Sequence, residues 1–283
     1  MSKKEDSMEL AGKTAVVTGS SRGIGEAIAR AMAAAGAQVV LLARRERALR
    51  AVADGIEAEG GQALVVPADV ADKGSINAAF SSIHSAWGGV DILVNNAGVQ
   101  GPIGPLHAAE VEQWWQSVEI NLKGCFLCSQ QVLPHMMERR SGKIINLSGG
   151  GAVGPRPFFS AYGASKAAVV RLTETLATEV SDYRIDVNAI APGAVNTEML
   201  KERLAAGERA GKAEIEADRA LFENGGTDPQ RPAALAVYLA SSRSDGLSGR
   251  LLSAVWDPWE HLDVDSVMAS EAFTVRRLRA EEG

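Results

Sequence analysis

Residues 13–25 read KTAVVTGSSRGIG, which joins an apolar strand to an alanine-rich helix through a glycine-rich turn. Gly19 permits the tight turn, Gly23 lets the backbone approach a pyrophosphate, and Gly25 lets helix and strand pack closely. The helix N-terminus adds backbone N–H groups and a partial positive charge, both of which favour phosphate. A glycine triplet alone is a weak signal, but its position between a strand and a helix indicates a dinucleotide site.

Short apolar runs alternate with helical patterns along the rest of the chain. Runs that are apolar throughout indicate strands buried on both faces, and the helical crossovers between them imply parallel pairing. The pattern predicts an α/β fold with a doubly wound parallel sheet (a Rossmann fold), in a single domain with a C-terminal extension. The predicted strands are residues 13–18, 38–42, 63–66, 90–94, 143–147, 185–190 and 250–254, and the predicted helices are residues 23–35, 46–59, 75–87, 109–117, 120–138 and 162–180.

The chain divides into three parts. We expect residues 1–9 to form a flexible tail, residues 10–254 the Rossmann-fold domain, and residues 255–283 a C-terminal extension. Within the domain, residues 193–228 form a long charged insertion after the sixth strand. Such a connection is typical of a lid over a substrate, and a solvated surface helix is an equally good interpretation.

The extension contains two tryptophans, Trp256 and Trp259, and an amphipathic pattern near residues 266–279. These tryptophans are suited either to packing on their own domain or to contact with a second subunit, and the two interpretations have equal weight. A role in walling a substrate pocket is less favoured.

Composition restricts the class of protein. Lys and Arg total 29 and Asp and Glu total 35, which gives a net charge of −6 and argues against a nucleic-acid or anionic-membrane partner. No apolar stretch reaches the length of about 18 residues that a membrane span requires, and the N-terminus lacks the apolar segment of a signal peptide. We therefore expect a cytoplasmic protein with a small-molecule substrate.

The two cysteines, Cys125 and Cys128, form a C-x-x-C pair. The spacing fits a redox pair or half of a zinc site, but the apolar flanks and the lack of a second ligand pair favour small buried residues on a helix. We expect no metal.

Residues 41–45 read LLARR at the end of the second strand. An NAD-binding unit carries Asp or Glu near this point to bind the ribose hydroxyls. Here the chain offers Arg44 and Arg45, with Arg22 in the glycine-rich turn. Guanidinium groups pair well with a 2′-phosphate, so NADP(H) is preferred while NAD(H) is not excluded. The alternative is that Arg44 and Arg45 are solvated residues of the next helix.

The ordered motifs resemble those of the short-chain dehydrogenase/reductase superfamily over residues 10–254. Residues 18–25 look like its T-G-x-x-x-G-I-G, residues 95–98 match its N-N-A-G after the fourth strand, and residues 162–166 match its Y-x-x-S-K. Asp69 and Val70 resemble the pair whose acid contacts adenine, and Pro192, Gly193 and Thr197 resemble the segment that touches the nicotinamide. The cofactor-binding residues expected from the resemblance and from the arginines are Gly19, Ser21, Arg22, Gly23, Ile24, Gly25, Arg44, Asp69, Val70, Asn95, Ala97, Gly98, Tyr162, Lys166, Pro192, Gly193 and Thr197.

The resemblance also implies a mechanism. Tyr162 donates a proton to the nascent alkoxide in reduction or accepts one in oxidation, Lys166 binds the nicotinamide ribose, and Asn121 holds a water in the proton path. Tyr162 and Lys166 are four residues apart and share a helix face. A free tyrosine titrates near ~10, and a neighbouring ammonium lowers that pKa.

The implied function is NADP(H)-dependent hydride transfer between nicotinamide and a carbonyl or alcohol substrate, in a homodimer or homotetramer. The alternative is a nucleotide-binding scaffold or sensor with little turnover. The family acts on sugar, fatty acyl and steroid substrates, so the fold leaves the substrate open.

The catalytic serine is where the sequence departs from the family. Its usual place, 13 residues before the tyrosine, is Gly149 (162 − 149 = 13), whereas Ser148 is 14 residues before it (162 − 148 = 14). Gly151 and Gly154 fit the family's loop if Ser148 is the catalytic position. We favour Ser148, because the chemistry calls for a hydroxyl donor there. Otherwise the role is vacant or filled by another group.

Overall fold

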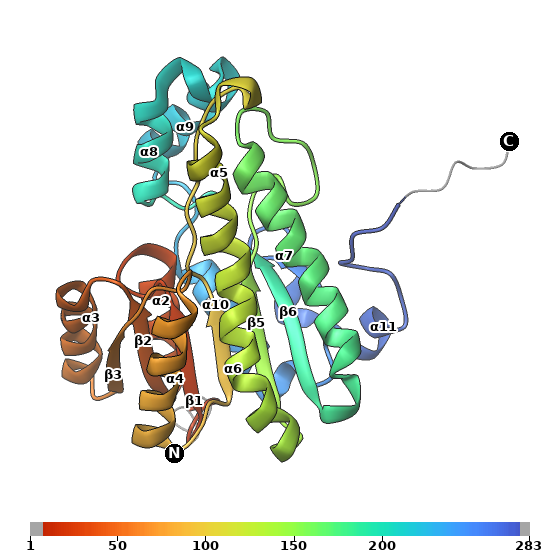
Figure 1. Ribbon diagram of the computed structural model, residues 1–283. Coiled ribbons are helices and arrows are strands. Elements are labelled where there is room, and N and C mark those ends of the chain that lie inside the picture. The colour runs from red at the N-terminus through yellow and green to blue at the C-terminus, as the bar shows by residue number, and fades with distance from the viewer. Residues whose placement is uncertain (1–7, 278–283) are drawn as a thin grey trace, which may run out of the picture.

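Seven parallel strands form one sheet at the centre of the molecule (Figure 1). The computed structural model describes residues 8–277. The strand order is β3-β2-β1-β4-β5-β6-β7, which reverses direction between β1 and β4. This topology confirms the predicted doubly wound parallel sheet. The strands are β1 (Thr14–Thr18), β2 (Gln38–Ala43), β3 (Gln62–Pro67), β4 (Ile92–Asn95), β5 (Gly142–Leu147), β6 (Ile185–Ala191) and β7 (Leu251–Ser253).

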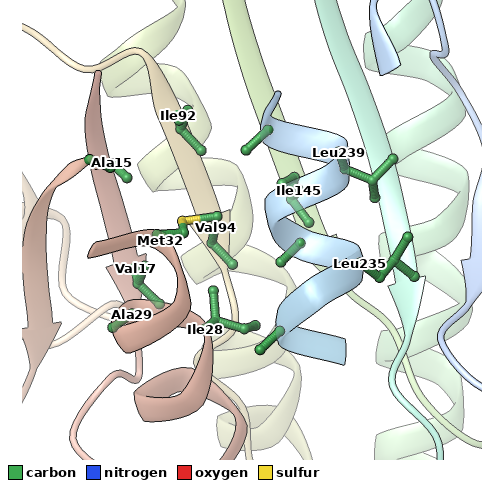
Figure 2. Packing of buried hydrophobic residues seen from close by; sticks show 14 of the residues in the cluster. Ala15, Val17, Ile28, Ala29, Met32, Ile92, Val94, Ile145, Leu235 and Leu239 are labelled. Atoms are coloured by element: carbon green, nitrogen blue, oxygen red, sulfur yellow. The ribbon is translucent and has the colours of Figure 1, made fainter. Parts of the chain in front are cut away.

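Helices cover both faces of the sheet, and a separate hydrophobic cluster lies under each layer. On one face lie α2 (Gly23–Ala34), α3 (Glu46–Ala58) and α10 (Gln230–Ala240), and on the other lie α4 (Lys73–Trp87), α6 (Gly124–Arg139) and α7 (Ser160–Glu179). Figure 2 shows the first layer, in which side chains of α2 and α10 meet those of β1, β4 and β5. The inner strands β1, β2, β4, β5 and β6 are thus buried on both sides, as predicted, whereas the edge strand β3 is only partly buried.

Residues 230–240 form α10, a helix that the sequence pattern does not predict. Pro229 and Pro232 interrupt the pattern there, but they lie at the N-cap and in the first turn. A proline is tolerated at the start of a helix because the first N–H groups have no partner within the helix.

The helices predicted at residues 109–117 and 120–138 are joined in the structure. A π-helical turn, Glu119–Lys123, connects α5 (Val111–Val118) directly to α6. Asn121 lies in this turn and is 2% exposed. A π turn inserts one extra residue into a helix and is frequent at functional sites.

The charged insertion folds into α8 (Glu198–Ala206), a short 3₁₀ turn and α9 (Lys212–Asn224). These helices lie at one end of the molecule, beyond the sheet (Figure 1). Ala206, Ala210 and Ile215 pack against Phe159 and Tyr162. The insertion therefore covers Tyr162, and its opening and closing as a lid stay a prediction.

Of the expected N-terminal tail, only Met8 and Glu9 are among the described residues. Leu10, the first residue of the expected domain, is buried, and its N–H donates to the carbonyl of Ala35 at 2.8 Å. Within residues 8–277, no helix is long and apolar enough to cross a membrane.

The described part of the C-terminal extension packs on its own domain. Trp259 is 3% exposed, lies 5.8 Å from Tyr238 between ring centroids, and donates from Nε1 to the carbonyl of Ala254. The N–H of Leu251 in the edge strand β7 donates to the carbonyl of Phe273 at 2.8 Å. Trp256, by contrast, is 85% exposed. The two tryptophans thus differ, and only Trp259 belongs to the core.

The amphipathic pattern near residues 266–279 produces only a short helix. This helix, α11 (Val264–Met268), is followed by irregular chain up to residue 277, and residues 278–279 lie outside the described range. At the end of α11, Arg250 Nη2 donates to the carbonyls of Val267 and Ser270 and so provides hydrogen bonds where the helix stops.

The tryptophan pair provides a test of this packing. Trp259→Ala removes a buried ring and should lower the free energy of unfolding by about 3–5 kcal/mol. Trp256→Ala changes an exposed side chain and should alter it by less than about 0.5 kcal/mol. Urea unfolding of both variants measures the difference, and equal effects would contradict this assignment of the two side chains.

Candidate active site

A groove of about 760 Å³ runs along the carboxyl ends of β1, β2, β3 and β4. It lies where the strand order reverses, the usual ligand position in such sheets. A larger cavity of about 1210 Å³ lies at the amino-terminal ends of β5 and β6, and no predicted site residue lines it. The predicted cofactor residues that line the groove are Gly19, Ser21, Arg22, Gly23, Ile24, Gly25, Arg44, Asp69, Val70, Ala97, Gly98 and Thr197.

The glycine-rich turn is held against the segment that follows β4. A Cβ at Gly19 would lie 2.8 Å from the Cα of Ala97, and one at Gly25 would lie 2.4 Å from the carbonyl oxygen of Gly19. Asn96 Nδ2 donates to the carbonyls of Thr18 at 2.8 Å and Gly19 at 3.2 Å. Side chains are therefore excluded at both glycines, and the turn is fixed at the mouth of the groove.

The N-terminus of α2 faces the groove and fits a phosphate. Its N-cap residue, Arg22, makes no side-chain capping bond, so the first N–H groups of the helix receive no side-chain acceptor from it. Gly23 and Gly25 in the first turn also line the groove. This donor set matches the pyrophosphate of a dinucleotide.

The arginines expected to select the cofactor lie at the same groove. Arg22, Arg44 and Arg45 all line it and are all exposed. Glu46, the next carboxylate along the chain, lies 3.6 Å from Arg50. A cofactor in the groove would thus meet guanidinium groups at the end of β2.

Asn95, Pro192 and Gly193 do not line the groove. Asn95 Nδ2 donates to Asn146 Oδ1 at 2.9 Å, so its side chain ties β4 to β5. Gly193 has a φ of 82°, and a Cβ there would lie 2.6 Å from a methyl carbon of Val255. Their predicted contact with the cofactor stays a prediction.

Tyr162, Lys166 and Asn121 meet beside the groove. Lys166 Nζ donates to the carbonyl of Leu147 at 2.7 Å and lies 5.8 Å from the ring centroid of Tyr162. Asn121 Oδ1 accepts from the N–H of Val99 at 2.8 Å, and its Nδ2 donates to the carbonyl of Val99 and to Ser165 Oγ, both at 2.9 Å. Asn121 thus fixes the segment after β4 against α7, and both of its amide N–H donors are in use.

Burial controls the protonation of both catalytic candidates. Burial lowers the pKa of Lys166 to about 8. Burial raises the pKa of Tyr162, and the positive charges of Arg156 and Arg203 oppose that shift. Lys166, which we expected to lower this pKa, lies 5.8 Å from the ring centroid of Tyr162, and Arg156 lies 5.9 Å from it. The effect of Lys166 stays a prediction, and the two arginines are further cations that favour the phenolate. No motif marks these arginines, because α8 and the loop before α7 bring them to Tyr162 from separate parts of the chain.

The position beside the Tyr162 hydroxyl belongs to Gly149. A Cβ at Gly149 would lie 2.3 Å from Tyr162 Oη. Ser148 is 3% exposed, and its Oγ has no hydrogen-bond partner among the described residues. The geometry therefore corrects our preference for Ser148. Residues 148–159 contain neither helix nor strand, so the spacing of glycines in that loop does not fix which residue faces the tyrosine.

Cys125 and Cys128 are buried free thiols on α6, which confirms their interpretation as small buried residues. Burial raises the pKa of Cys125 to about 12 and that of Cys128 further still, so neither is a thiolate at neutral pH. Among residues 8–277, no group of three or more His, Cys, Asp or Glu side chains is arranged to hold a metal.

Known proteins are similar to this chain in sequence and in fold. The family model described as short chain dehydrogenase matches residues 13–207. 3beta-hydroxysteroid dehydrogenase 1 of Eggerthella lenta is 40% identical over 246 residues, covering 86% of this chain and 92% of that protein. 5-keto-D-gluconate 5-reductase of Escherichia coli is 38% identical over 248 residues, covering 87% of this chain and 95% of that protein.

A solved structure is also similar to this chain. The gluconate 5-dehydrogenase from Burkholderia cenocepacia, in complex with NADP and tartrate, matches with a TM-score of 0.78 at 34% identity, over 88% of this chain and 95% of that chain. The family model covers more than half of the chain, and both relatives are matched over nearly their whole length. The protein is therefore a member of the short-chain dehydrogenase/reductase family, an oxidoreductase of alcohol and carbonyl groups.

Proposed function

We propose that this enzyme transfers a hydride between NADP(H) and a carbonyl or alcohol substrate, with Tyr162 as the proton donor or acceptor. The observation that carries the proposal is that Asn121 and Lys166 flank Gly98 in the groove, with Lys166 beside the Tyr162 ring. A Cβ at Gly98 would lie 3.1 Å from Asn121 Oδ1 and 3.5 Å from Lys166 Nζ, and Lys166 Nζ lies 5.8 Å from the centroid of the Tyr162 ring. The bound nicotinamide supplies or accepts the hydride. The protein binds both partners, excludes water and moves the proton.

The chain's own groups divide this work. Tyr162 lies in a buried position beneath α8 and α9, where a proton can pass to a substrate oxygen without competition from bulk water. Lys166 Nζ donates to the carbonyl of Leu147, which orients it, and we assign to it the binding of the nicotinamide ribose. Asn121 uses both side-chain N–H donors internally, so we assign any water in the proton path to its backbone carbonyl.

NADP(H) is the proposed cofactor because three guanidinium groups line the groove and one relative was solved with NADP. Relatives act on a hydroxysteroid and on a ketogluconate, by their names, so the substrate is not fixed by relationship. A cytoplasmic location and a homodimer or homotetramer stay predictions.

The second candidate function is a nucleotide-binding sensor with little turnover. The glycine at position 149 favours it, because that position supplies no hydroxyl beside Tyr162. Screening turnover with NADPH against sugars, acyl thioesters and small ketones separates the two functions, since a sensor would bind NADPH without reducing any of them.

Cofactor choice is tested at the end of β2. Arg44→Ala should weaken NADPH binding by about tenfold or more, the scale of one lost charged hydrogen bond, and leave NADH binding nearly unchanged. Fluorescence titration of both cofactors measures this. Arg50→Ala, which removes an equal charge on α3 outside the groove, is the control. Equal affinity of the wild type for NADH and NADPH would refute the assignment.

The proton donor is tested by Tyr162→Phe, which should lower turnover by about 10²–10⁴-fold while NADPH still binds. Reduction uses the protonated phenol, and burial raises the pKa of Tyr162. The rate of reduction in the wild type should therefore hold through neutral pH and fall only in the alkaline range. Near-normal turnover of the variant would remove Tyr162 from this role.

The serine position is tested by pairs of variants. Ser148→Ala removes a hydroxyl without partners and should change turnover by less than about threefold. Gly149→Ala places a methyl group against Tyr162 Oη and should lower turnover by about tenfold or more.

Gly149→Ser places a β-carbon at the same point as Gly149→Ala does, and it also adds a hydroxyl. It should exceed Gly149→Ala in turnover, because a donor at this position can bind the substrate oxygen. A loss of about 10²-fold on Ser148→Ala, the scale for losing an oxyanion donor, would restore Ser148 to the catalytic role.

A further inference from the structure

Four charged side chains meet between the loop before α7 and the helices over Tyr162. Arg156 comes from the loop, Arg203 from α8, and Glu214 and Asp218 from α9. Glu214 Oε1 accepts a hydrogen bond from Arg156 Nη2 and lies 3.7 Å from Arg203 Nε. All four side chains are buried or mostly buried, and their formal charges sum to zero.

The two ion pairs in this cluster differ. Arg203 donates to both oxygens of Asp218, with Nε at 2.8 Å from Oδ2 and Nη2 at 2.6 Å from Oδ1, and Asp218 is 3% exposed. Both carboxylate oxygens of Asp218 are therefore already bound by Arg203. Arg156 makes a single hydrogen bond to the described residues, through Nη2, and its partner Glu214 has a side chain that is 26% exposed. A guanidinium has five N–H donors, so most of those of Arg156 remain available to a ligand.

The guanidinium of Arg156 is also held beside the catalytic phenol. Its central carbon lies 4.1 Å from the ring centroid of Phe159 and 5.9 Å from that of Tyr162. Phe159 is fully buried, so it provides a fixed surface on which the guanidinium stacks. The hydrogen-bond donors of Arg156 thus lie close enough to the Tyr162 hydroxyl for one small substrate to contact both.

We propose that Arg156 binds a carboxylate of the substrate, and that Glu214 occupies this carboxylate site until the substrate arrives. The inference rests on the proposed function and names its substrate class: small keto acids and the corresponding hydroxy acids. The planar fork of an arginine matches a carboxylate in a bidentate way. With the carboxylate on Arg156, a carbonyl a few bonds away lies at Tyr162.

For the cluster to stay neutral, a substrate carboxylate must replace Glu214 in the cluster and not add to it. A substrate carboxylate beside Glu214 would leave the cluster with a net charge of −1 in a mostly buried place, which is costly. If Glu214 instead turns outward, the cluster stays neutral. Glu214 lies in the first turn of α9 and is already partly exposed, so it can reach solvent. The same exchange breaks the ion pair that joins α9 to the loop before α7.

The experiment uses keto acids of increasing length, namely pyruvate, acetoacetate, levulinate and 5-oxohexanoate, each beside its methyl ester. The acid and its ester carry the same ketone and differ in charge. The change in the ratio of their kcat/KM values between wild type and variant reports the carboxylate contact, because differences in intrinsic carbonyl reactivity cancel. We expect the wild type to prefer at least one acid. The chain length of the best acid then measures the separation of Arg156 from Tyr162.

Arg156→Gln should lower the acid-to-ester ratio by about 100-fold, the scale for truncating one partner of a desolvated charge pair. Glu214→Gln should lower KM for the acid severalfold, because it removes the competing carboxylate. Arg219→Gln removes a charge from the exposed side of α9 and is the matched control, expected to change neither value.

A ratio near one in the wild type, or an equal loss for acid and ester in Arg156→Gln, would overturn the inference and leave Arg156 with a role in holding α9. The proposed function would stand in that case, provided that Tyr162→Phe abolishes reduction of the ester. If no ketone in the panel is reduced, calorimetric binding of 4-hydroxypentanoate to the NADPH complex decides. Binding that Arg156→Gln abolishes supports the carboxylate site, and no binding to the wild type overturns it.

Discussion

The hydrogen-bonded junction between the turn after β1 and the segment after β4 holds the rest of the site in place. Asn96 Nδ2 donates to the carbonyls of Thr18 and Gly19, while Thr18 Oγ1 accepts from the N–H groups of Asn96 and Ala97, both at 3.0 Å. Here the strand order reverses, so the connecting helices leave for opposite faces and a crevice opens between them. Because Gly19 has no side chain, the turn after β1 can contact the segment after β4 at this point. The N-terminus of α2 then points into the groove.

The chemistry beside this junction is held at a cost to stability. Lys166 is fully enclosed, and burial moves its pKa from 10.5 to about 8. Below about pH 8 the folded protein must bury this charge, at a cost of about 3 kcal/mol by the pKa difference. Between about pH 8 and 10.5 the folded chain releases the proton while the unfolded chain keeps it, so stability rises with pH there. Among residues 8–277 Lys166 has no carboxylate partner, and a buried lysine of this kind is typical of a functional site.

The loop before α7 links Tyr162 to the helices that cover it. Phe158 has a φ of 70°, a strained value for a residue with a side chain, and its carbonyl accepts from the N–H of Gly104 at 2.9 Å. Gly211, between α8 and α9, has no Cβ to meet the Phe158 ring, which would lie 2.7 Å away. The strained loop thus packs against the covering helices, while Phe159 and Arg156 bring an aromatic face and a cation to Tyr162. Movement of these helices and the environment of the phenol are therefore coupled.

The sequence by itself determined the sheet and the glycine-rich turn, because these depend on local periodicity and on a strand–turn–helix motif of fixed spacing. It offered Tyr162, Lys166 and Asn121 as site residues only through the resemblance to a family. It did not determine α10, whose prolines interrupt the pattern, or the π turn at Asn121, whose extra residue leaves no periodic signal. Only the tertiary structure decided between Ser148 and Gly149, since beyond the end of β5 no regular backbone relates position to direction. Only it placed Arg156 and Glu214 together, because ion pairs between a loop and a distant helix depend on packing and not on spacing along the chain.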